Sequence, residues 1–179
     1  MITLEPFRES DWHYIQEWIR NDKELIIYGG ALEFSFPITK EQVEEYLSGT
    51  NRIVFKVRED QQIIGMAEIS NESKDVVKIS RVLIGERKMR GKGLCLKLVE
   101  KLIEFITVYF IRRQVVLNVF NENQNAINCY LKAGFKWSET PSVLLRIGDK
   151  EYRYREMYKS LLTHKYSSES NSDIINYSI

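Results

Sequence analysis

The chain has 179 residues, 44% of them hydrophobic and 28% charged, which is enough for one domain with a sizeable core. Its 26 basic and 25 acidic side chains nearly cancel, so the charge gives no support for a protein that binds nucleic acid or a membrane surface as a whole. The N-terminus has neither the basic start nor the apolar run of a signal peptide, and no apolar run is long enough to cross a bilayer.

The chain has two cysteines, Cys95 and Cys129, and neither belongs to a CxxC pair. Two cysteines do not make a disulfide framework, so we expect a reducing, cytoplasmic setting. We expect His13 and His164 on the surface, where neither histidine is placed to activate a thiol. We therefore interpret Cys129 as a small buried hydrophobe rather than a nucleophile.

The N-terminal part of the chain predicts one strand and two helices. Residues 2–7 alternate as in a strand, and Ser10 then caps a helix whose apolar residues share one face. Residues 22–38 are aromatic and irregular. A capping-box spacing that begins at Thr39 predicts the second helix over residues 40–48.

The middle of the chain predicts three strands and a long helix. Residues 52–58 and 62–70 alternate as the two strands of a hairpin, and residues 76–84 form a third strand. A glycine-rich, basic segment over residues 85–93 separates this strand from an apolar helix over residues 94–108.

The C-terminal part predicts a buried strand over residues 113–119 and then a helix that opens at Asn123 and stops at Gly134. Two more strands, about 135–146 and 151–159, flank a turn. The residues after 162 are rich in serine and asparagine, which predicts a polar tail without its own core.

The element order is therefore β-α-α-β-β-β-α-β-α-β-β. Antiparallel runs with one βαβ-like crossover predict an α/β (α+β) domain, with a mixed, mostly antiparallel sheet of about seven strands and helices on both faces. We assign one domain to residues 1–162 and a tail to residues 163–179. If the tail is ordered, a second copy of the chain would be a suitable support, so we keep a homodimer as a hypothesis.

The stretch RGKGLCLKL, residues 90–98, has the composition of a phosphate-binding turn. The first backbone N–H groups of a helix lack internal partners, and glycine lets a ligand approach them. Arg90 and Lys92 would supply countercharge beside Gly91 and Gly93. Neither a Walker A loop nor a dinucleotide-binding fingerprint matches the glycine spacing. A glycine-containing loop with solvated basic residues remains the alternative.

The pattern [RQ]-x-x-G-x-[GA] is matched by Arg90-Gly91-Lys92-Gly93-Leu94-Cys95, with cysteine in place of the final small residue. This segment resembles motif A of the GCN5-related N-acetyltransferase (GNAT) family. The resemblance implies that these six residues bind the pyrophosphate of acetyl-coenzyme A. Cysteine is only slightly larger than alanine, so the helix can still approach the turn.

A second segment, NENQNAINCYLKAGF over residues 121–135, resembles the family's N-x-x-A-x-x-x-Y…GF element. Asn123, Ala126 and Tyr130 match its coenzyme-contacting positions. Each of the two polar residues also has a purely structural interpretation, since Asn123 is a good N-cap and Tyr130 could pack in the core. The two linked segments together identify the chain as a member of the family, with some uncharacterised bacterial members among those it resembles.

The resemblance implies an acyltransferase that moves an acetyl group from acetyl-CoA to an amine within a ternary complex. Backbone groups of a splayed strand, here Val82-Leu83-Ile84, would polarise the thioester. Tyr130 would be the general acid, because a phenol is protonated at neutral pH and close in acidity to a thiol. The family does not imply a metal.

The general base is not evident. Asn118 stands where some relatives that acetylate protein N-termini carry glutamate, and asparagine cannot accept the proton. Glu68 is the substitute we identify, because burial in an otherwise apolar strand would make its carboxylate a stronger base. An outward-facing, solvated Glu68 is the alternative, and so are a base that acts through water and capture of the neutral fraction of the amine.

The acceptor site is expected in the aromatic segment, where Tyr28, Glu33 and Phe34 could receive a cationic amine. These residues could equally be core. A small amine, an aminoglycoside-like compound and a protein N-terminus all remain open as acceptors. A non-catalytic acyl-CoA-binding or sensor module on the same fold is the alternative function. A nucleic-acid site on the basic turn is disfavoured, because the positive charge is confined to one turn.

Overall fold

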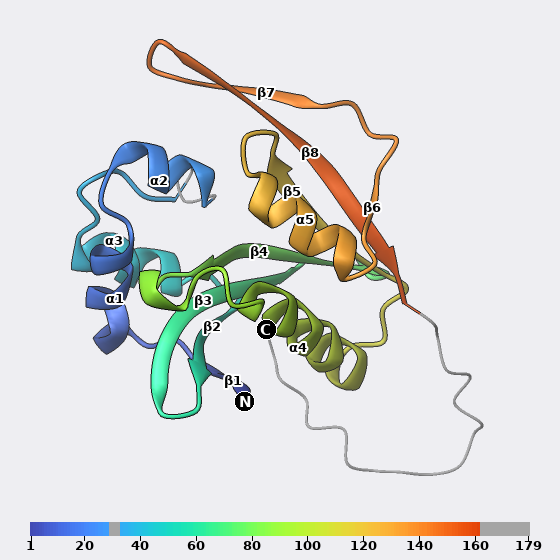
Figure 1. Cartoon of the computed structure of the whole chain (residues 1–179), viewed down its shortest axis with the longest axis horizontal. Helices are drawn as coiled ribbons and strands as arrows, with labels where there is room; N and C mark the ends of the chain where they lie inside the picture. Colours follow the sequence, from blue (N-terminus) through green and yellow to red (C-terminus); the bar gives the residue numbers. More distant parts are fainter. Residues whose placement is uncertain (29–32, 162–179) are drawn as a thin grey trace.

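The computed structural model describes residues 1–28 and 33–161, which form a mixed sheet with helices on both faces (Figure 1). The whole predicted tail, residues 163–179, lies outside the described residues, and so does the homodimer hypothesis that rests on it. The strands are β1 (Ile2–Pro6), β2 (Arg52–Glu59), β3 (Gln62–Asn71), β4 (Val76–Ile84), β5 (Gln114–Phe120), β6 (Lys136–Trp137), β7 (Val143–Ile147) and β8 (Lys150–Ser160). The α-helices are α1 (Trp12–Trp18), α2 (Asp22–Ile27), α3 (Lys40–Leu47), α4 (Leu94–Tyr109) and α5 (Gln124–Lys132). Short 3-10 turns, η1 (Glu9–Asp11) and η2 (Arg87–Met89), precede α1 and α4.

The strand order is β1-β2-β3-β4-β5-β8-β6, and β7 pairs with β8. Every pairing in this described sheet is antiparallel except that of β4 with β5. The helix α4 is the crossover between these two parallel strands, as the predicted βαβ-like unit requires. The expected α+β fold, with a mixed and mostly antiparallel sheet, is therefore confirmed.

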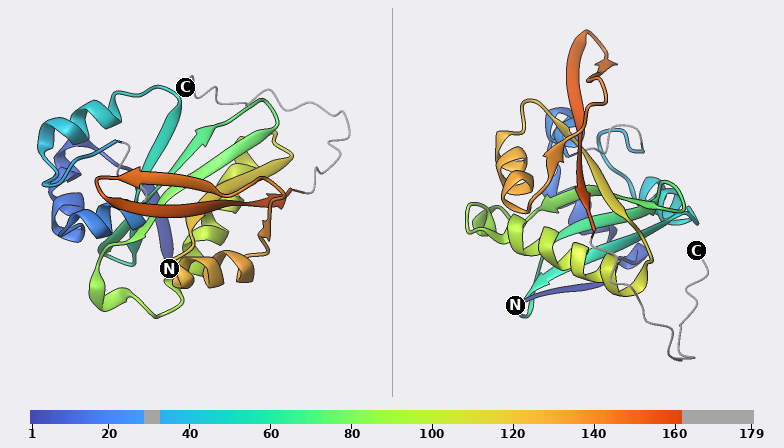
Figure 2. Two further views of the ribbon diagram at one scale, coloured as in Figure 1. Left: turned by 90° about the horizontal axis from the view of Figure 1, so that it is seen from above. Right: turned by 90° about the vertical axis from the view of Figure 1, so that its right-hand side faces the viewer.

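Two apolar clusters form the core, one beneath α4 and α5 and the other beneath α1, α2 and α3. Figure 2 shows how these helices are arranged around the sheet. The first cluster contains the buried side of α4 and α5, including Leu98, Leu102 and Ile106, which are fully buried. The second contains α1, α2 and α3 with one side chain each from β2, β3 and β4. Both faces are covered because the spacing of apolar residues on α1 and α4 gives each helix one buried stripe.

The strand β4 changes the direction of its side chains at a bulge. Glu68 of β3 lies opposite Ser80 and Met66 opposite Leu83, so Arg81 and Val82 together face the single residue Ala67. Arg81 takes a left-handed φ of 50°. As a result Ile79 points into the first cluster, whereas Leu83, which has the same parity, points into the second.

The structure adds two elements that the sequence analysis did not predict. The segment 22–38, expected to be irregular, begins with α2, whose N-cap Asn21 accepts a hydrogen bond from the amide of Glu24. The predicted strand over residues 135–146 is instead split into β6 and β7. Two expected caps are confirmed: Thr39 accepts from the amide of Gln42, and Gly134 has a φ of 85° at the end of α5. The predicted Ser10 cap is wrong, because Ser10 lies inside the turn η1 and Asp11 is the N-cap of α1.

The two cysteines form a disulfide, which corrects the expectation that they are unlinked small residues. Cys95 in the first turn of α4 is bonded to Cys129 of α5, which follows it by 34 positions in sequence, and their Cα atoms are 6.2 Å apart. The sequence could not reveal this pairing, because only the packing of α4 against α5 brings the two side chains together. The disulfide links the glycine turn to the helix that carries Tyr130.

We predict that this cross-link stabilises the domain. Reducing it should lower the free energy of unfolding by about 3 kcal/mol, because a closed loop of this length restricts the unfolded chain. Denaturant unfolding with and without reductant measures the difference, and Cys95→Ala is the control, since its stability should not respond to reductant. Two freely alkylated thiols in protein prepared without reductant would contradict the pairing.

Candidate active site

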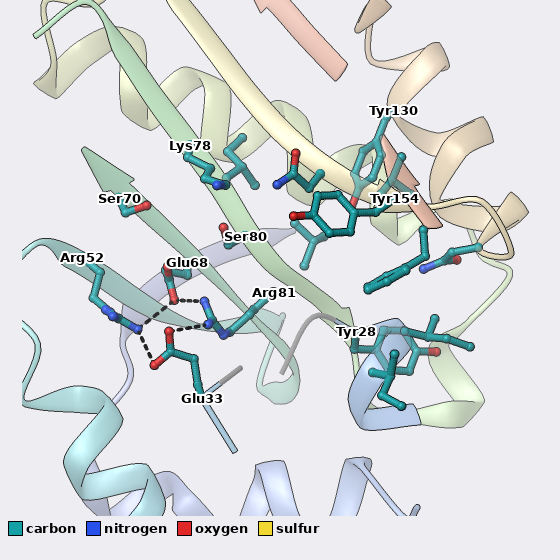
Figure 3. Close-up of a pocket in the computed structure, with 18 of the residues that line it drawn as sticks. Tyr28, Glu33, Arg52, Glu68, Ser70, Lys78, Ser80, Arg81, Tyr130 and Tyr154 are labelled. Atoms are coloured by element: carbon teal, nitrogen blue, oxygen red, sulfur yellow. Dashed lines mark hydrogen bonds and ion pairs between the residues drawn. The ribbon is translucent and has the colours of Figure 1, made fainter. Parts of the chain in front are cut away.

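The parallel strands β4 and β5 separate soon after they begin. Their pairing is limited to residues 76–78 opposite residues 114–116. Beyond these pairs a cavity of about 340 Å³ opens between residues 79–82 of β4 and residues 118–120 of β5. Figure 3 shows the side chains that line it. A cavity of this size is within the range of small-molecule sites.

Tyr130 closes one side of the cavity. Its side chain comes from α5, is 6% exposed and packs against the ring of Phe135. Burial raises the pKa of Tyr130 well above the ordinary value of 10.0. Its hydroxyl has no hydrogen-bond partner in the described part of the chain. Tyr130 therefore stays protonated at neutral pH and keeps its proton available to a group in the cavity.

The glycine turn presents unused backbone donors. Gly91 and Gly93 have φ values of 77° and 75°, and Gly93 is the N-cap of α4. A Cβ atom at either glycine would meet nothing within 4 Å, so the positive φ, rather than lack of space, requires glycine here. The amides of residues 91–96 have no hydrogen-bond acceptor within the described ranges. This is the arrangement that an anion needs at a helix N-terminus.

The side chain of Arg90, expected as a countercharge, is hydrogen-bonded to the backbone at the end of β4. Its Nε donates to the carbonyl of Ile84 at 2.8 Å and its terminal nitrogen to the carbonyl of Gly85 at 3.2 Å. Its guanidinium also lies over the ring of Tyr28, at 5.5 Å from the centroid. Arg90 thus ties the turn to the end of β4, while Lys92 is exposed.

The remaining positions predicted to bind coenzyme are distributed over strand, turn and helix. Asn123 lines the cavity and also caps α5, since its Oδ1 accepts from the amide of Ala126 at 3.2 Å. Of the predicted strand segment only Val82 lines the cavity; Leu83 is buried in the second cluster and Ile84 packs against the first. Leu94 and Cys95 lie in the first turn of α4, away from the cavity lining.

Four charged side chains form a compact cluster at the other side of the cavity, which we call the four-charge cluster: Glu33, Arg52, Glu68 and Arg81 (Figure 3). Arg81 contacts Glu68 Oε2 at 2.5 Å and Glu33 Oε1 at 3.1 Å. Arg52 lies 3.4 Å from Glu33 and 3.9 Å from Glu68. The cluster joins β2, β3 and β4 to the segment that precedes α3.

Glu68 is buried and ion-paired, at 3% exposure, so the alternative of a solvated Glu68 does not apply. Its Oε2 accepts from Arg81 and from the hydroxyl of Tyr46, a residue of α3. Both Arg52 and Arg81 lie 4.9 Å from the centroid of the Tyr46 ring. Burial, with the negative charge of Glu68, raises the pKa of Tyr46 well above 10.0. Tyr46 therefore stays protonated and donates its hydrogen bond to Glu68.

The predicted acceptor residues divide into two groups. Tyr28 and Glu33 line the cavity. Phe34 does not: it is buried in the second cluster, against the ring of Tyr46 at 5.0 Å. The sequence analysis missed Arg52 and Arg81. The sequence did contain a sign that Arg81 belongs to the site. A basic residue interrupts the apolar pattern of β4, and β4 pairs with β3, the strand that carries Glu68.

The cavity thus combines a protonated phenol at one side with paired charges at the other. It can hold a polar ligand and donate a proton to it. Within the described residues, no group of three or more His, Cys, Asp or Glu side chains could hold a metal ion. No helix there is long and apolar enough to cross a membrane.

The chain was compared with known protein families. A family model described as an acetyltransferase (GNAT) domain matches residues 1–136. This match includes the strands of the sheet up to β5, the glycine turn, and the helix of Tyr130. It therefore covers most of the residues that build the cavity.

Solved structures with the same fold include acetyltransferases. A spermidine N-acetyltransferase from Vibrio cholerae, solved with CoA and spermine, has a TM-score of 0.73 at 17% identity over 89% of this chain and 95% of its own. The aminoglycoside acetyltransferase AAC(6')-Ib, solved with ribostamycin and coenzyme A, has a TM-score of 0.68 at 25% identity over 89% and 93%. A GNAT-family acetyltransferase from Streptococcus pneumoniae has a TM-score of 0.62 at 19% identity over 90% and 99%.

We predict that Glu68→Gln lowers the free energy of unfolding by about 2 kcal/mol, because it removes a buried charge that Arg81 and Arg52 both face. The matched control is Glu151→Gln, which breaks a 2.9 Å pair with Arg146 between side chains that are 52% and 72% exposed. That change should stay within about 0.5 kcal/mol. Equal effects of the two substitutions in denaturant unfolding would argue against a structural role of the four-charge cluster.

Proposed function

Because the chain belongs to the GNAT acetyltransferase family it is an acyltransferase with acetyl-CoA as co-substrate, and we propose that the cavity between β4 and β5 is where it acetylates an amine. The observation that carries the proposal is the position of Tyr130. Its protonated hydroxyl faces the opening that the two diverging strands create. The acyl donor supplies an activated acetyl group, and the residues of the chain position it.

The glycine turn suits the pyrophosphate of acetyl-CoA. Six successive amides, residues 91–96, have no acceptor within the described part of the chain, and the dipole of α4 favours negative charge at this end. Lys92 adds an exposed positive charge beside them. Arg90 has a positioning role in this proposal, since its donors hold the carbonyls of Ile84 and Gly85. The residues present therefore fit the coenzyme.

The reaction that we propose is direct transfer in a ternary complex. The amine nitrogen forms a bond to the acetyl carbon, and the bond from that carbon to sulfur breaks. Tyr130 gives its proton to the departing thiolate, and the acetylated amine loses one proton to a base, so the protons balance. Backbone groups near Val82 polarise the acetyl carbonyl, because this residue lines the cavity on the splayed side of β4.

The base in this proposal is solvent rather than Glu68. Glu68 was the candidate from sequence, but it accepts from both Arg81 and Tyr46. Taking a proton would cost the carboxylate its ion pair with Arg81 and leave a buried guanidinium unbalanced. We therefore propose that the enzyme captures the neutral fraction of the amine, with the proton lost to water, and that Glu68 positions the two arginines.

The cytoplasmic location expected from sequence stays a prediction. In a reducing compartment the Cys95–Cys129 disulfide would be open. Neither a nucleic acid nor a membrane is part of the proposed function, which needs only acetyl-CoA and an amine.

We predict selective stabilisation by acetyl-CoA. A thermal-shift assay should give a higher Tm with acetyl-CoA than with adenosine at the same concentration, because only acetyl-CoA carries the pyrophosphate and the thioester. Gly93→Ala should reduce this shift, since alanine at a φ of 75° costs about 1 kcal/mol and moves the turn. The control is Gly148→Ala, at a φ of 56° in the β7–β8 turn. No selective shift would refute the proposed function.

We predict that Tyr130→Phe lowers kcat by about 10²-fold or more while the KM for acetyl-CoA changes little, because the ring remains and only the proton donor is lost. Release of free CoA thiol in the presence of an amine panel measures the rate. An unchanged kcat would remove Tyr130 from the chemistry. Acetyl-CoA binding without turnover of any amine would instead indicate an acyl-CoA-binding module.

A further inference from the structure

The charged side chains that line the cavity in the described part of the chain balance to zero. Three are carboxylates and three are cations: Glu33, Glu68 and Glu72, and Arg52, Lys78 and Arg81. An acceptor with several positive charges would need a cavity with a net negative charge to hold it. This cavity does not have one.

Each of the three carboxylates already has a cation beside it. Glu68 and Glu33 lie 2.5 Å and 3.1 Å from nitrogens of Arg81. Glu72 Oε1 lies 3.5 Å from the ammonium group of Lys78. A second ammonium group on an acceptor would therefore have to break one of these pairs before it found a carboxylate.

The hydrogen-bond donors, by contrast, are in surplus. A guanidinium has five N–H donors, and Arg52 and Arg81 both line the cavity. Three of these nitrogens, Nε and Nη1 of Arg52 and Nε of Arg81, are fully buried, and Arg52 Nη1 already lies 3.4 Å from Glu33. The side chains of Arg52 and Lys78 are 18% and 27% exposed and line the cavity, so their accessible N–H groups favour a ligand that brings acceptor oxygens.

Neighbouring side chains extend the same donor surface. Ser70 lies opposite Arg52 in the β2–β3 register, and Ser80 lies opposite Glu68 across β3 and β4. Figure 3 shows both serines and Lys78 above the four-charge cluster, on the side of the cavity away from Tyr28. Lys78 is 27% exposed and its single described pairing is with Glu72. Hydroxyls, an ammonium and two guanidinium forks are the groups that bind a carboxylate or a phosphate-like acid.

The other side of the cavity is aromatic and apolar. Tyr28, Phe120 and Tyr154 line it together with Tyr130, the proposed proton donor. Phe120 packs edge-on against Tyr154 at 5.7 Å. The amine must reach the acetyl group near Tyr130, so an acid on the same small molecule would extend toward Arg52 and Lys78.

We propose that the acceptor is a small amine that also carries an acidic group, such as an amino acid, and not a polycation. This inference rests on the proposed function, because it names the substrate class of the same cavity. Arg52 is the residue that determines the preference. The acid on the substrate supplies acceptor oxygens to the accessible N–H groups of Arg52 and Lys78.

The test compares matched acceptors in the thiol-release assay. The panel contains the standard L-amino acids, their amides, and spermidine and kanamycin as polycations. The amide keeps the amine but loses the negative charge, and its amine is the less basic of the two, so a preference for the acid cannot come from a larger neutral fraction. We expect kcat/KM to be at least about ten-fold higher for the best amino acid than for its amide, as one charge-assisted hydrogen bond allows.

The variant Arg52→Gln removes the guanidinium and should bring the ratio of acid to amide close to one. The loss should appear in the KM for the amino acid, while the KM for acetyl-CoA is unchanged. Arg113→Gln is the matched control, since Arg113 is 78% exposed, faces Asp75 at 3.7 Å and does not line the cavity. It should keep the wild-type ratio.

The outcomes separate the two proposals. Suppose that acetyl-CoA stabilises the protein selectively, but that spermidine, kanamycin or the amides are turned over at or above the rate of the amino acids. This result would overturn the substrate class and leave the acetyltransferase function intact. Turnover of none of the acid-bearing amines would overturn the substrate class as well. An acid-to-amide ratio that is unchanged in Arg52→Gln would overturn the role of Arg52. The absence of stabilisation by acetyl-CoA would refute the function itself.

Discussion

The structure depends on how short the parallel pairing between β4 and β5 is. Three residue pairs join the strands, and after them the two backbones diverge. Neighbouring strands inside a sheet normally continue to hydrogen-bond along their whole length, because unpaired backbone groups are costly to bury. Here the groups that lose their partners face a cavity, in which a bound ligand can satisfy them. The opening exists because β4 stays paired with β3 beyond the bulge, while β5 stays paired with β8 on its other side.

The bulge at Arg81 has two consequences for the site. It reverses the direction of the following side chains, so that Leu83 enters the second cluster and leaves Val82 on the cavity side. It also places the Arg81 guanidinium between Glu68 and Glu33. A left-handed conformation costs an arginine about 1 kcal/mol, and two ion pairs with a cation–π contact to Tyr46 offset this cost. Arg81 therefore connects β4 to the segment that precedes α3, at the side of the cavity where we propose that the acceptor binds.

A covalent bond links the proposed coenzyme turn to the proposed proton donor. The disulfide between Cys95 and Cys129 joins the first turn of α4 to the residue before Tyr130. When this disulfide is formed, it ties the turn that would hold the pyrophosphate to the helix that carries the phenol. Asn123 contributes to the same helix, since it caps α5 and lines the cavity.

Most of the elements, and the chemistry that depends on short spacings, can be predicted from local patterns in the sequence. The glycines of the turn, the N-caps at Thr39 and Asn123 and the stop at Gly134 act within a few residues, so local patterns reveal them. The remaining features become visible in the folded chain alone, because they depend on residues that are far apart in the sequence. The fold buried Phe34 in the core, bonded two cysteines that looked independent, and turned Glu68 from a candidate base into one member of an ion-paired cluster with Arg52 and Arg81. The strand β4 reads as a simple alternation, and its bulge appears only when β3 is placed beside it, since a bulge is a property of the pairing and not of either strand alone.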